Sequence, residues 1–235
     1  MISHKKKCIF IHIPKVAGTS IIEFLKCSEH NYNNNINIPS FPQGCSKFSP
    51  PPPHFRVIDY VKYGYVSKEQ FNVYFKFSFV RNPWDRIVSE YKYRNHPMEY
   101  SFKEFLFRHF PKPSWNDKYC HIIPQYDFLY DENGNNLVDF VGKFENLQKD
   151  FNKVCRFLGI PDKKLPHRNQ SQSLFNLRYN QGLGELFTRI RGKLNRRQKQ
   201  NTFAHYTQYY DSETEEYVAE LYKNDINVFQ YKFGH

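Results

Sequence analysis

The distribution of apolar residues predicts two buried strands, each followed by a helix. Cys8–Ile13 is a short apolar run rich in β-branched and aromatic residues that stops at Pro14, and Phe75–Val80 alternates and is strongly aromatic. Thr19–Lys26 continues the first strand as a short helix, and Trp84–Arg94 repeats apolar residues at helical spacing. Strands that alternate with helices indicate an α/β fold with a central parallel sheet flanked by helices.

The middle of the chain predicts two short helices and a hairpin. Ser67–Gln70 and Ser101–Glu104 are capping boxes, in which the first serine and the fourth side chain can satisfy free amides at a helix start. Tyr126–Tyr130 and Leu137–Phe144 flank an Asn-Gly pair. Because Asn-Gly favours the tight turn of a hairpin, these two segments are predicted to be paired strands.

The remainder of the chain predicts two longer helices. The first follows Glu145, carries an apolar stripe and ends at Gly159 as its C-cap. The second is predicted to be capped by Ser212 with Glu215 and to run to about Tyr222. The stripe of the first helix, which we expect in the core, consists of Leu147, Phe151, Val154 and Leu158.

No repeat or linker divides the chain, so residues 1–235 are interpreted as a single domain. Residues 31–53 are rich in Asn and Pro, and we expect them to form a surface loop without strand pairing. Residues 189–200 are strongly basic. A disordered loop, a lid over a nucleotide and a landing patch for an acidic acceptor would each explain that segment, and its composition favours the first.

The turn between the first strand and its helix carries the first candidate chemistry. Lys15 is followed by Gly18, Thr19 and Ser20, where the helix begins. A helix N-terminus directs free amides and a positive dipole at one point, which suits a phosphate or sulfate, and the lysine adds a full charge. A magnesium-dependent P-loop places its lysine after the last glycine, whereas here the lysine comes first. This order argues against a kinase or NTPase.

The turn after the second strand carries another set of anion-binding residues. Arg81 ends the strand, Pro83 starts the helix, and Ser89 lies inside that helix. Ligands of open α/β sheets bind in the crevice at the carboxyl ends of the strands. We therefore expect Arg81 and Ser89 to approach the same ligand as the first loop.

Both turns resemble motifs of the sulfotransferases that use 3′-phosphoadenosine 5′-phosphosulfate (PAPS). Ile13–Ser20 is similar to the 5′-phosphosulfate loop, in the I-P-K-x-A-G-T-S form of carbohydrate sulfotransferases, and Phe79–Tyr91 is similar to the 3′-phosphate motif. Val138–Asn169 resembles a third block of that family. The resemblance implies a P-loop-like fold and sulfuryl transfer from PAPS to a hydroxyl, with adenosine 3′,5′-bisphosphate (PAP) as product.

The resemblance also implies roles for individual residues. Lys15, Ala17, Gly18, Thr19 and Ser20 would bind the phosphosulfate, and Lys15 would stabilise the charge that develops on the leaving phosphate. In the same way, Arg81 and Ser89 would bind the 3′-phosphate. No metal is expected, because cationic side chains take the place of magnesium and no carboxylate cluster lies near the loop.

A histidine is the candidate base that would remove the acceptor's proton. His54 follows the proline run and lies between the two phosphate motifs, where the family commonly has its catalytic histidine. His12 lies inside the first strand and is interpreted as a satisfied core residue. His121 and His167 lie in segments that give no reason to rank them.

The composition changes the interpretation only in the choice of partner. A formal net charge of +11 predicts an anionic partner, which fits the nucleotide donor and a carbohydrate acceptor, including an acidic one. A P-loop kinase and a basic nucleic-acid-binding protein remain the alternatives, although the second leaves both phosphate motifs unexplained.

The compartment is predicted from what the sequence lacks. The five scattered cysteines form no C-x-x-C pair and are read as reduced thiols, and no apolar run is long enough to cross a membrane. No signal peptide is recognised at the N-terminus. A cytoplasmic location is therefore expected.

Overall fold

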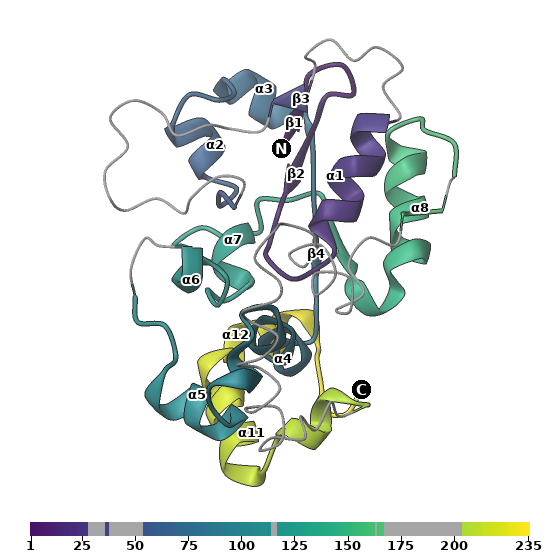
Figure 1. The fold of residues 1–235 in the computed structure, drawn as a ribbon. Coiled ribbons are helices and arrows are strands. Elements are labelled where there is room, and N and C mark those ends of the chain that lie inside the picture. Colours follow the sequence, from purple (N-terminus) through teal and green to yellow (C-terminus); the bar gives the residue numbers. More distant parts are fainter. Residues whose placement is uncertain (28–35, 38–53, 114–116, 163, 167–203) are drawn as a thin grey trace, which may run out of the picture.

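A computed structural model describes residues 1–27, 36–37, 54–113, 117–162, 164–166 and 204–235, and its ribbon is shown in Figure 1. It contains a five-stranded sheet in the order β3-β1-β2-β4-β5. The bounds of these strands, in sheet order, are Ile36–Asn37 (β3), Ile2–Ser3 (β1), Cys8–Ile11 (β2), Phe75–Val80 (β4) and Phe140–Lys143 (β5).

The two predicted strands are neighbours at the centre of the sheet. β2 and β4 run parallel with Cys8 opposite Phe75, and β4 and β5 run parallel with Phe77 opposite Phe140. β1 pairs antiparallel with both β2 and β3, so the sheet is parallel only from β2 to β5. The predicted α/β fold with a central parallel sheet is confirmed, and the antiparallel strands β1 and β3 extend that sheet on one side.

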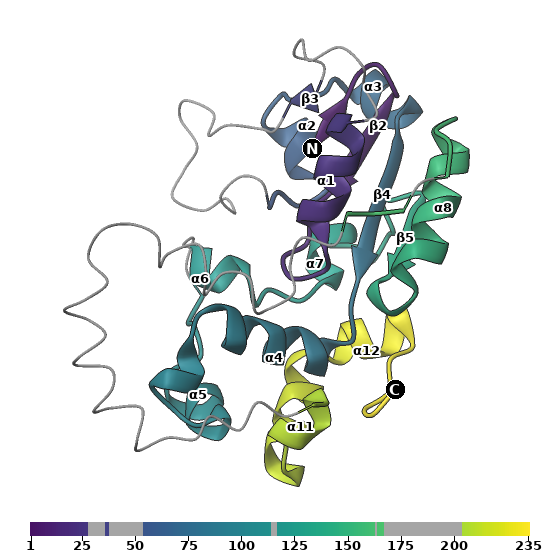
Figure 2. The ribbon, with the colours of Figure 1, turned by 45° about the vertical axis from the view of Figure 1, so that its right-hand side comes forward.

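Helices cover both faces of the sheet (Figures 1 and 2). On one face α1 (Gly18–Cys27) and α8 (Leu147–Phe157) lie side by side, with the rings of Phe24 and Phe151 4.9 Å apart between centroids. The other face is covered by the short helices α2 (Asp59–Lys62), α3 (Lys68–Val73) and α7 (Tyr126–Leu129). All the strand residues of β2 are consequently buried.

A second group of helices lies beyond the carboxyl end of β4 (Figure 2). Its longest member, α4 (Pro83–Tyr93), starts where Asn82 accepts a hydrogen bond from the amide of Trp84, with Pro83 at the first helical position. The indole of Trp84 donates to the carbonyl of Glu215 at 3.1 Å, which fixes the C-terminal helices against α4. The other helices here are α5 (Phe102–Arg108), α11 (Ser212–Leu221) and α12 (Lys223–Phe229), whereas α6 (Asp117–Cys120) lies beside α7 (Figures 1 and 2).

Short 3₁₀ turns connect several of these elements. They are η1 (His96–Met98), η2 (Phe144–Asn146) and η3 (Tyr206–Tyr209).

Several local predictions are confirmed. Ser67 and Gln70 form the predicted capping box of α3, and Ser101 accepts from the amide of Glu104 at the start of α5. Gly159 has a φ of +62° and follows α8 directly after its C-cap, in the left-handed conformation that glycine adopts at little cost.

The predicted hairpin is wrong. Tyr126–Leu129 forms α7, and only Tyr130 and Asn136 make an isolated antiparallel bridge. The turn itself forms, with the Asp131 carboxylate accepting from the amides of Asn133 and Asn135. β5 pairs with β4 instead, because pairing on a buried central strand satisfies its backbone and covers apolar surface at the same time.

Two further predictions need correction. Within the Asn/Pro-rich segment, Ile36–Asn37 forms β3 by pairing with β1, because these two positions lack proline and can join the open edge of the sheet. The cap of α11 is Asp211 with Thr214, one residue before the predicted Ser212, since the aspartate carboxylate reaches the amide of Thr214 at 2.9 Å. The basic segment 189–200 and His167 lie outside the described residues.

Candidate functional site

The loop between β2 and α1 has an unusual backbone. Lys15 and Ala17 have φ values of +70° and +66°, a left-handed conformation that costs roughly 1–2 kcal/mol per residue without glycine. The tight turn brings Gly18 and Thr19 to the start of α1 with amides that have no acceptor among the described residues. The amide of Ser20 donates to the carbonyl of Ala17 at 3.0 Å. Two free amides therefore remain at the N-terminus of α1 to receive an anion.

Gly18 is required by a neighbouring side chain of the protein. A Cβ atom at this position would lie 1.9 Å from Cδ2 of His12, so the imidazole occupies the space of the missing side chain. His12 is buried, as predicted, but it is not satisfied as predicted, because its Nδ1 has no hydrogen-bond partner among the described residues. Burial and then the nearby His54 lower the pKa of His12 well below its usual value, so its ring is neutral.

Lys15 projects from the loop onto an aromatic ring. Its Nζ lies 3.7 Å from the ring centroid of Tyr93, a cation–π contact with the last residue of α4. Burial lowers the pKa of Lys15 to about 8; the charge of Glu90 raises it, while Arg81 and Arg94 lower it further. An anion at the loop would favour the charged form of this lysine.

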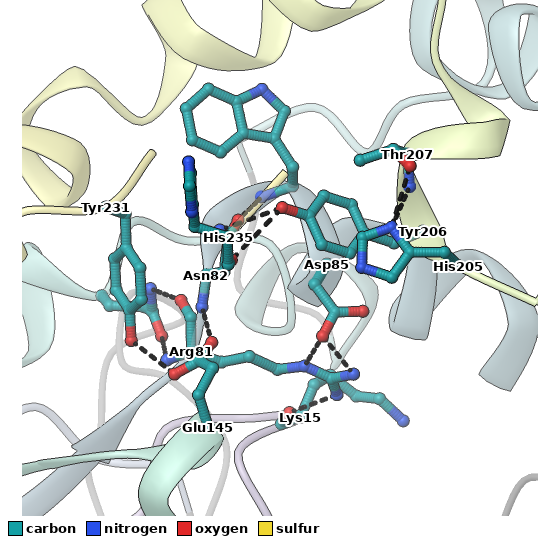
Figure 3. A network of polar contacts seen from close by, with 12 residues as sticks. Lys15, Arg81, Asn82, Asp85, Glu145, His205, Tyr206, Thr207, Tyr231 and His235 are labelled. Atoms are coloured by element: carbon teal, nitrogen blue, oxygen red, sulfur yellow. Dashed lines mark hydrogen bonds and ion pairs between the residues drawn. The ribbon is translucent and has the colours of Figure 1, made fainter. Parts of the chain in front are cut away.

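Arg81 connects the two predicted motifs (Figure 3). Its Nη1 donates to the carbonyl of Lys15 at 3.2 Å, while its Nε and Nη2 each lie 2.8 Å from the Asp85 carboxylate. The guanidinium also lies 4.2 Å from the ring centroid of Phe144. A guanidinium has five N–H donors, so two remain for a ligand after these three contacts.

The turn that carries Arg81 is held by side chains from three parts of the chain. The amide of Arg81 donates to Oε1 of Gln125 at 2.8 Å, and the amide of Asn82 donates to Oε1 of Glu145 at 2.7 Å. The Tyr231 hydroxyl donates to the same Glu145 carboxylate at 3.1 Å. The end of β4 is thus fixed by tertiary contacts, and the position of Arg81 is fixed with it.

Ser89 lies on the face of α4 that carries Asp85, the carboxylate paired with Arg81. Asp85, Ser89 and Lys92 are spaced at i, i+4 and i+7, which places them along one stripe of the helix. Nζ of Lys92 lies 4.8 Å from the ring centroid of Tyr209. The pKa of Lys92 is lowered, because burial and the charge of Arg81 together outweigh the charge of Asp85, which raises it. This stripe extends the positive region beyond Arg81, and Lys92 was not singled out from the sequence.

His54 is buried beside His12. Its Nδ1 lies 2.9 Å from the carbonyl oxygen of His12, which can only accept a hydrogen bond. Nδ1 therefore carries the hydrogen, and Nε2 has the lone pair that a general base needs. The His54 ring lies 4.5 Å from the His12 ring and 5.3 Å from the His121 ring between centroids.

His121 is the site residue that the sequence did not rank. Its Nδ1 lies 2.8 Å from the Glu90 carboxylate, and Arg94 donates to the other oxygen of that carboxylate at 2.7 Å. Glu90 and Arg94 stand four residues apart on a helix, a spacing that signals an ion pair. Nothing local indicates that His121, 31 residues away, completes the group.

The structure joins the predicted residues through continuous contacts. Lys15 lies on Tyr93, Tyr93 stacks on His121 with centroids 5.7 Å apart, and His121 packs edge-to-face on His54. Arg81 is attached to the other side of Lys15 through the loop carbonyl. The loop, the end of β4 and the imidazoles thus form one site, while Ser89 is placed on the adjoining face of α4 only by its helical spacing.

Two kinds of feature are absent from the part of the chain that the structure describes. Its His, Cys, Asp and Glu side chains form no group of three or more that could hold a metal ion. None of its helices is long and apolar enough to cross a membrane.

The fold and the site define an α/β protein with an anion-binding loop after its central strand and a second cation after the neighbouring strand. The sequence model of the sulfotransferase family matches residues 1–232, so the chain belongs to the sulfotransferase family. Its general chemistry is accordingly sulfuryl transfer.

One relative carries no functional name. It is an uncharacterised protein of Archaeoglobus fulgidus, 39% identical over 98 residues that cover 41% of this chain and 78% of that protein. No solved structure matches the chain.

Proposed function

We propose that this protein transfers a sulfuryl group from PAPS to a hydroxyl of a carbohydrate, as one catalytic domain. The observation that carries the proposal is the hydrogen bond from Arg81 to the carbonyl of Lys15. It holds two cationic motifs against one another, and PAPS carries anionic groups at both its 5′ and 3′ positions. A kinase substrate such as ATP has no 3′-phosphate to occupy the second motif.

The donor would be held by the protein at both ends. Lys15 and the amides of Gly18 and Thr19 would contact the 5′-phosphosulfate, with Ala17 and Ser20 shaping the loop. Arg81 would offer its two remaining N–H groups to the 3′-phosphate, with Ser89 and Lys92 on the adjoining face of α4. Charge that develops on the leaving phosphate would be stabilised by Lys15, which needs no metal ion for this role.

His54 would act as the general base. Its Nε2 would take the proton of the acceptor hydroxyl while the acceptor oxygen forms a bond to sulfur. The bond from sulfur to the bridging oxygen breaks, its electron pair stays on the 5′-phosphate, and PAP leaves. The carbonyl of His12 holds the imidazole in the required tautomer.

Binding of PAP tests the donor assignment directly. Calorimetry in the presence of EDTA should show tight binding of PAP and much weaker binding of adenosine 5′-monophosphate, because only PAP occupies both cationic motifs. Preference for ATP with magnesium would favour a kinase, and preference for an oligonucleotide would favour a nucleic-acid-binding protein.

The carbohydrate assignment rests on the loop sequence and on the net charge of +11. A screen with labelled PAPS should transfer the label to glycans and not to phenols or tyrosyl peptides. For an acidic glycan, the apparent affinity should fall with salt more steeply than donor affinity, because exposed charges are screened more than enclosed ones. Label confined to phenols or peptides would refute the carbohydrate assignment and leave the donor site intact.

A further inference from the structure

A buried carboxylate lies behind the proposed base, and the reaction outlined above gives it no role. Glu90 is 2% exposed and His121 is 7% exposed, so both are shielded from water. The Glu90 carboxylate contacts Nδ1 of His121 at 2.8 Å and Nε of Arg94 at 2.7 Å. The His121 ring then packs edge-to-face on the ring of His54, with centroids 5.3 Å apart.

Glu90 is charged despite its burial. Burial alone would raise the pKa of this carboxyl, but hydrogen bonds from His121 and Arg94 and the charge of Arg94 hold the pKa below its usual range. An ionised carboxylate only accepts hydrogen bonds, so Nδ1 of His121 carries a hydrogen that it donates to Glu90. The negative charge is therefore fixed behind the imidazole pair, where water screens it little.

The other ionisable groups around the two imidazoles do not favour a further positive charge. Several ionisable groups besides Glu90 lie around this cluster in the described part of the chain, and they include three cations, a neutral imidazole and a phenol. They are Lys15 from the loop, Arg86 and Arg94 from α4, His12 directly after β2, and Tyr93. The Met1 amino group also acts on His12, but burial lowers its pKa to about 5. Glu90 thus supplies the charge that can balance an imidazolium here.

We propose that Glu90, acting through His121, is a positioning residue that stabilises the imidazolium form of His54 as this residue takes the acceptor's proton. The inference deepens the proposed function and rests on it. During transfer the O–H bond of the acceptor breaks and the proton passes to Nε2 of His54. The oxygen bonds to sulfur, and the bond between sulfur and the 5′-phosphate breaks. Glu90 and His121 exchange no atom with the substrate.

The pH profile of kcat tests this role. Glu90→Gln removes the charge and keeps the shape, so the acid limb should move to lower pH by roughly half to one unit, because the imidazolium of His54 loses its nearby anion. The rate on the plateau should fall while the dissociation constant of PAP, measured at pH 6.5 where Lys15 keeps its proton, stays within about 2-fold, a difference of roughly 0.4 kcal/mol. Glu99→Gln is the matched control, since Glu99 pairs with His96 outside the site and is exposed.

Arg94→Gln should shift the acid limb of the pH profile in the opposite direction. It removes the cation that compensates Glu90, so the acid limb should move to higher pH. This variant also decides the matter if Glu90→Gln does not fold, which thermal unfolding would show. If Glu90 and Arg94 had only a structural role, both variants would have a lower kcat, but the acid limb of the pH profile would not move in opposite directions.

A titration of His54 that requires no enzymatic turnover tests this inference separately from the proposed function. Proton–nitrogen correlation spectra of histidine-labelled protein, assigned with His54→Gln, follow the titration of His54 with and without PAP. The midpoint of His54 should fall in Glu90→Gln and rise in Arg94→Gln, even if no acceptor is ever found. A midpoint that is the same in wild type and in every variant that folds would overturn the inference.

Discussion

Nη1 of Arg81 donates a hydrogen bond to the main-chain carbonyl of Lys15 at 3.2 Å. The carbonyl belongs to a left-handed residue, so the arginine holds the loop in a conformation that its own sequence does not favour. The same arginine reaches Asp85 on α4. One side chain therefore sets the distance between the two proposed anion-binding points, and both are expected to respond when it is removed.

Lys15→Ala should lower kcat by about 10²-fold or more, comparable to loss of one oxyanion-stabilising group. The fold should remain intact, because the lysine side chain is only partly buried and lies on the exposed ring of Tyr93. Steady-state kinetics with labelled PAPS and a thermal unfolding curve measure the two effects. Lys68→Ala, on an exposed position of α3, serves as control, and activity within a few-fold of wild type would remove the role from Lys15.

Arg81→Ala should weaken the binding of PAP more than that of adenosine 5′-monophosphate. A charge-assisted hydrogen bond to the 3′-phosphate is lost only with PAP, whereas the support of the Lys15 loop is lost with both nucleotides. Calorimetry with the two nucleotides separates these effects, with Arg108→Ala on the exposed side of α5 as control. Equal weakening of both nucleotides would show that Arg81 only supports the loop.

Donor binding should weaken as the pH rises through about 8, where the free protein loses the proton of Lys15. The sign follows from the charge: an anionic donor favours protonated lysine, so its binding raises the pKa and takes up a proton above pH 8. Dissociation constants of PAP between pH 6.5 and 9.5 would measure this linkage. Lys15→Met should bind weakly throughout and lose the dependence in this range; an unchanged slope in that variant would assign it to another group.

Gly18→Ala should destabilise the protein by about 1–3 kcal/mol, since the new methyl group overlaps the His12 ring. His12 would have to move, and its carbonyl holds His54, so kcat should fall as well. Urea denaturation measures the stability. The substitution should be better tolerated in a His12→Ala background, and a purely additive double mutant would contradict the proposed steric conflict.

His54→Gln should lower kcat by about 10²- to 10⁴-fold, the usual contribution of a general base. The acid limb of the pH profile should disappear while the affinity for PAP is retained, because the proposed donor ligands are Lys15, the loop amides and Arg81, whereas His54 contacts the His12 carbonyl and the rings of His12 and His121. His109→Gln, on an exposed histidine beside Tyr100, is the control. A variant that keeps the limb and most of its rate would transfer the role to another group, with His121 as the first candidate.

The features that the sequence alone determined are those built from neighbouring residues. The strand before Lys15, the turn at Arg81 to Pro83 and the capping box at Ser67 depend on local backbone geometry and on side chains a few residues away. Such interactions are short in sequence, so their patterns can be read directly. The same reasoning identified the family through contiguous motifs.

Only the tertiary structure decided which distant side chains meet. His121 joins His54 through ring packing and joins Glu90 through a hydrogen bond across 31 residues, and no local pattern encodes either contact. The space at Gly18 is filled by His12, and β5 joins β4 in place of the hairpin that its Asn-Gly turn predicted. For β5, pairing with the buried sheet outweighed the local preference of the Asn-Gly turn for a hairpin. Packing against the core satisfies more backbone groups and removes more apolar surface from water than a hairpin does.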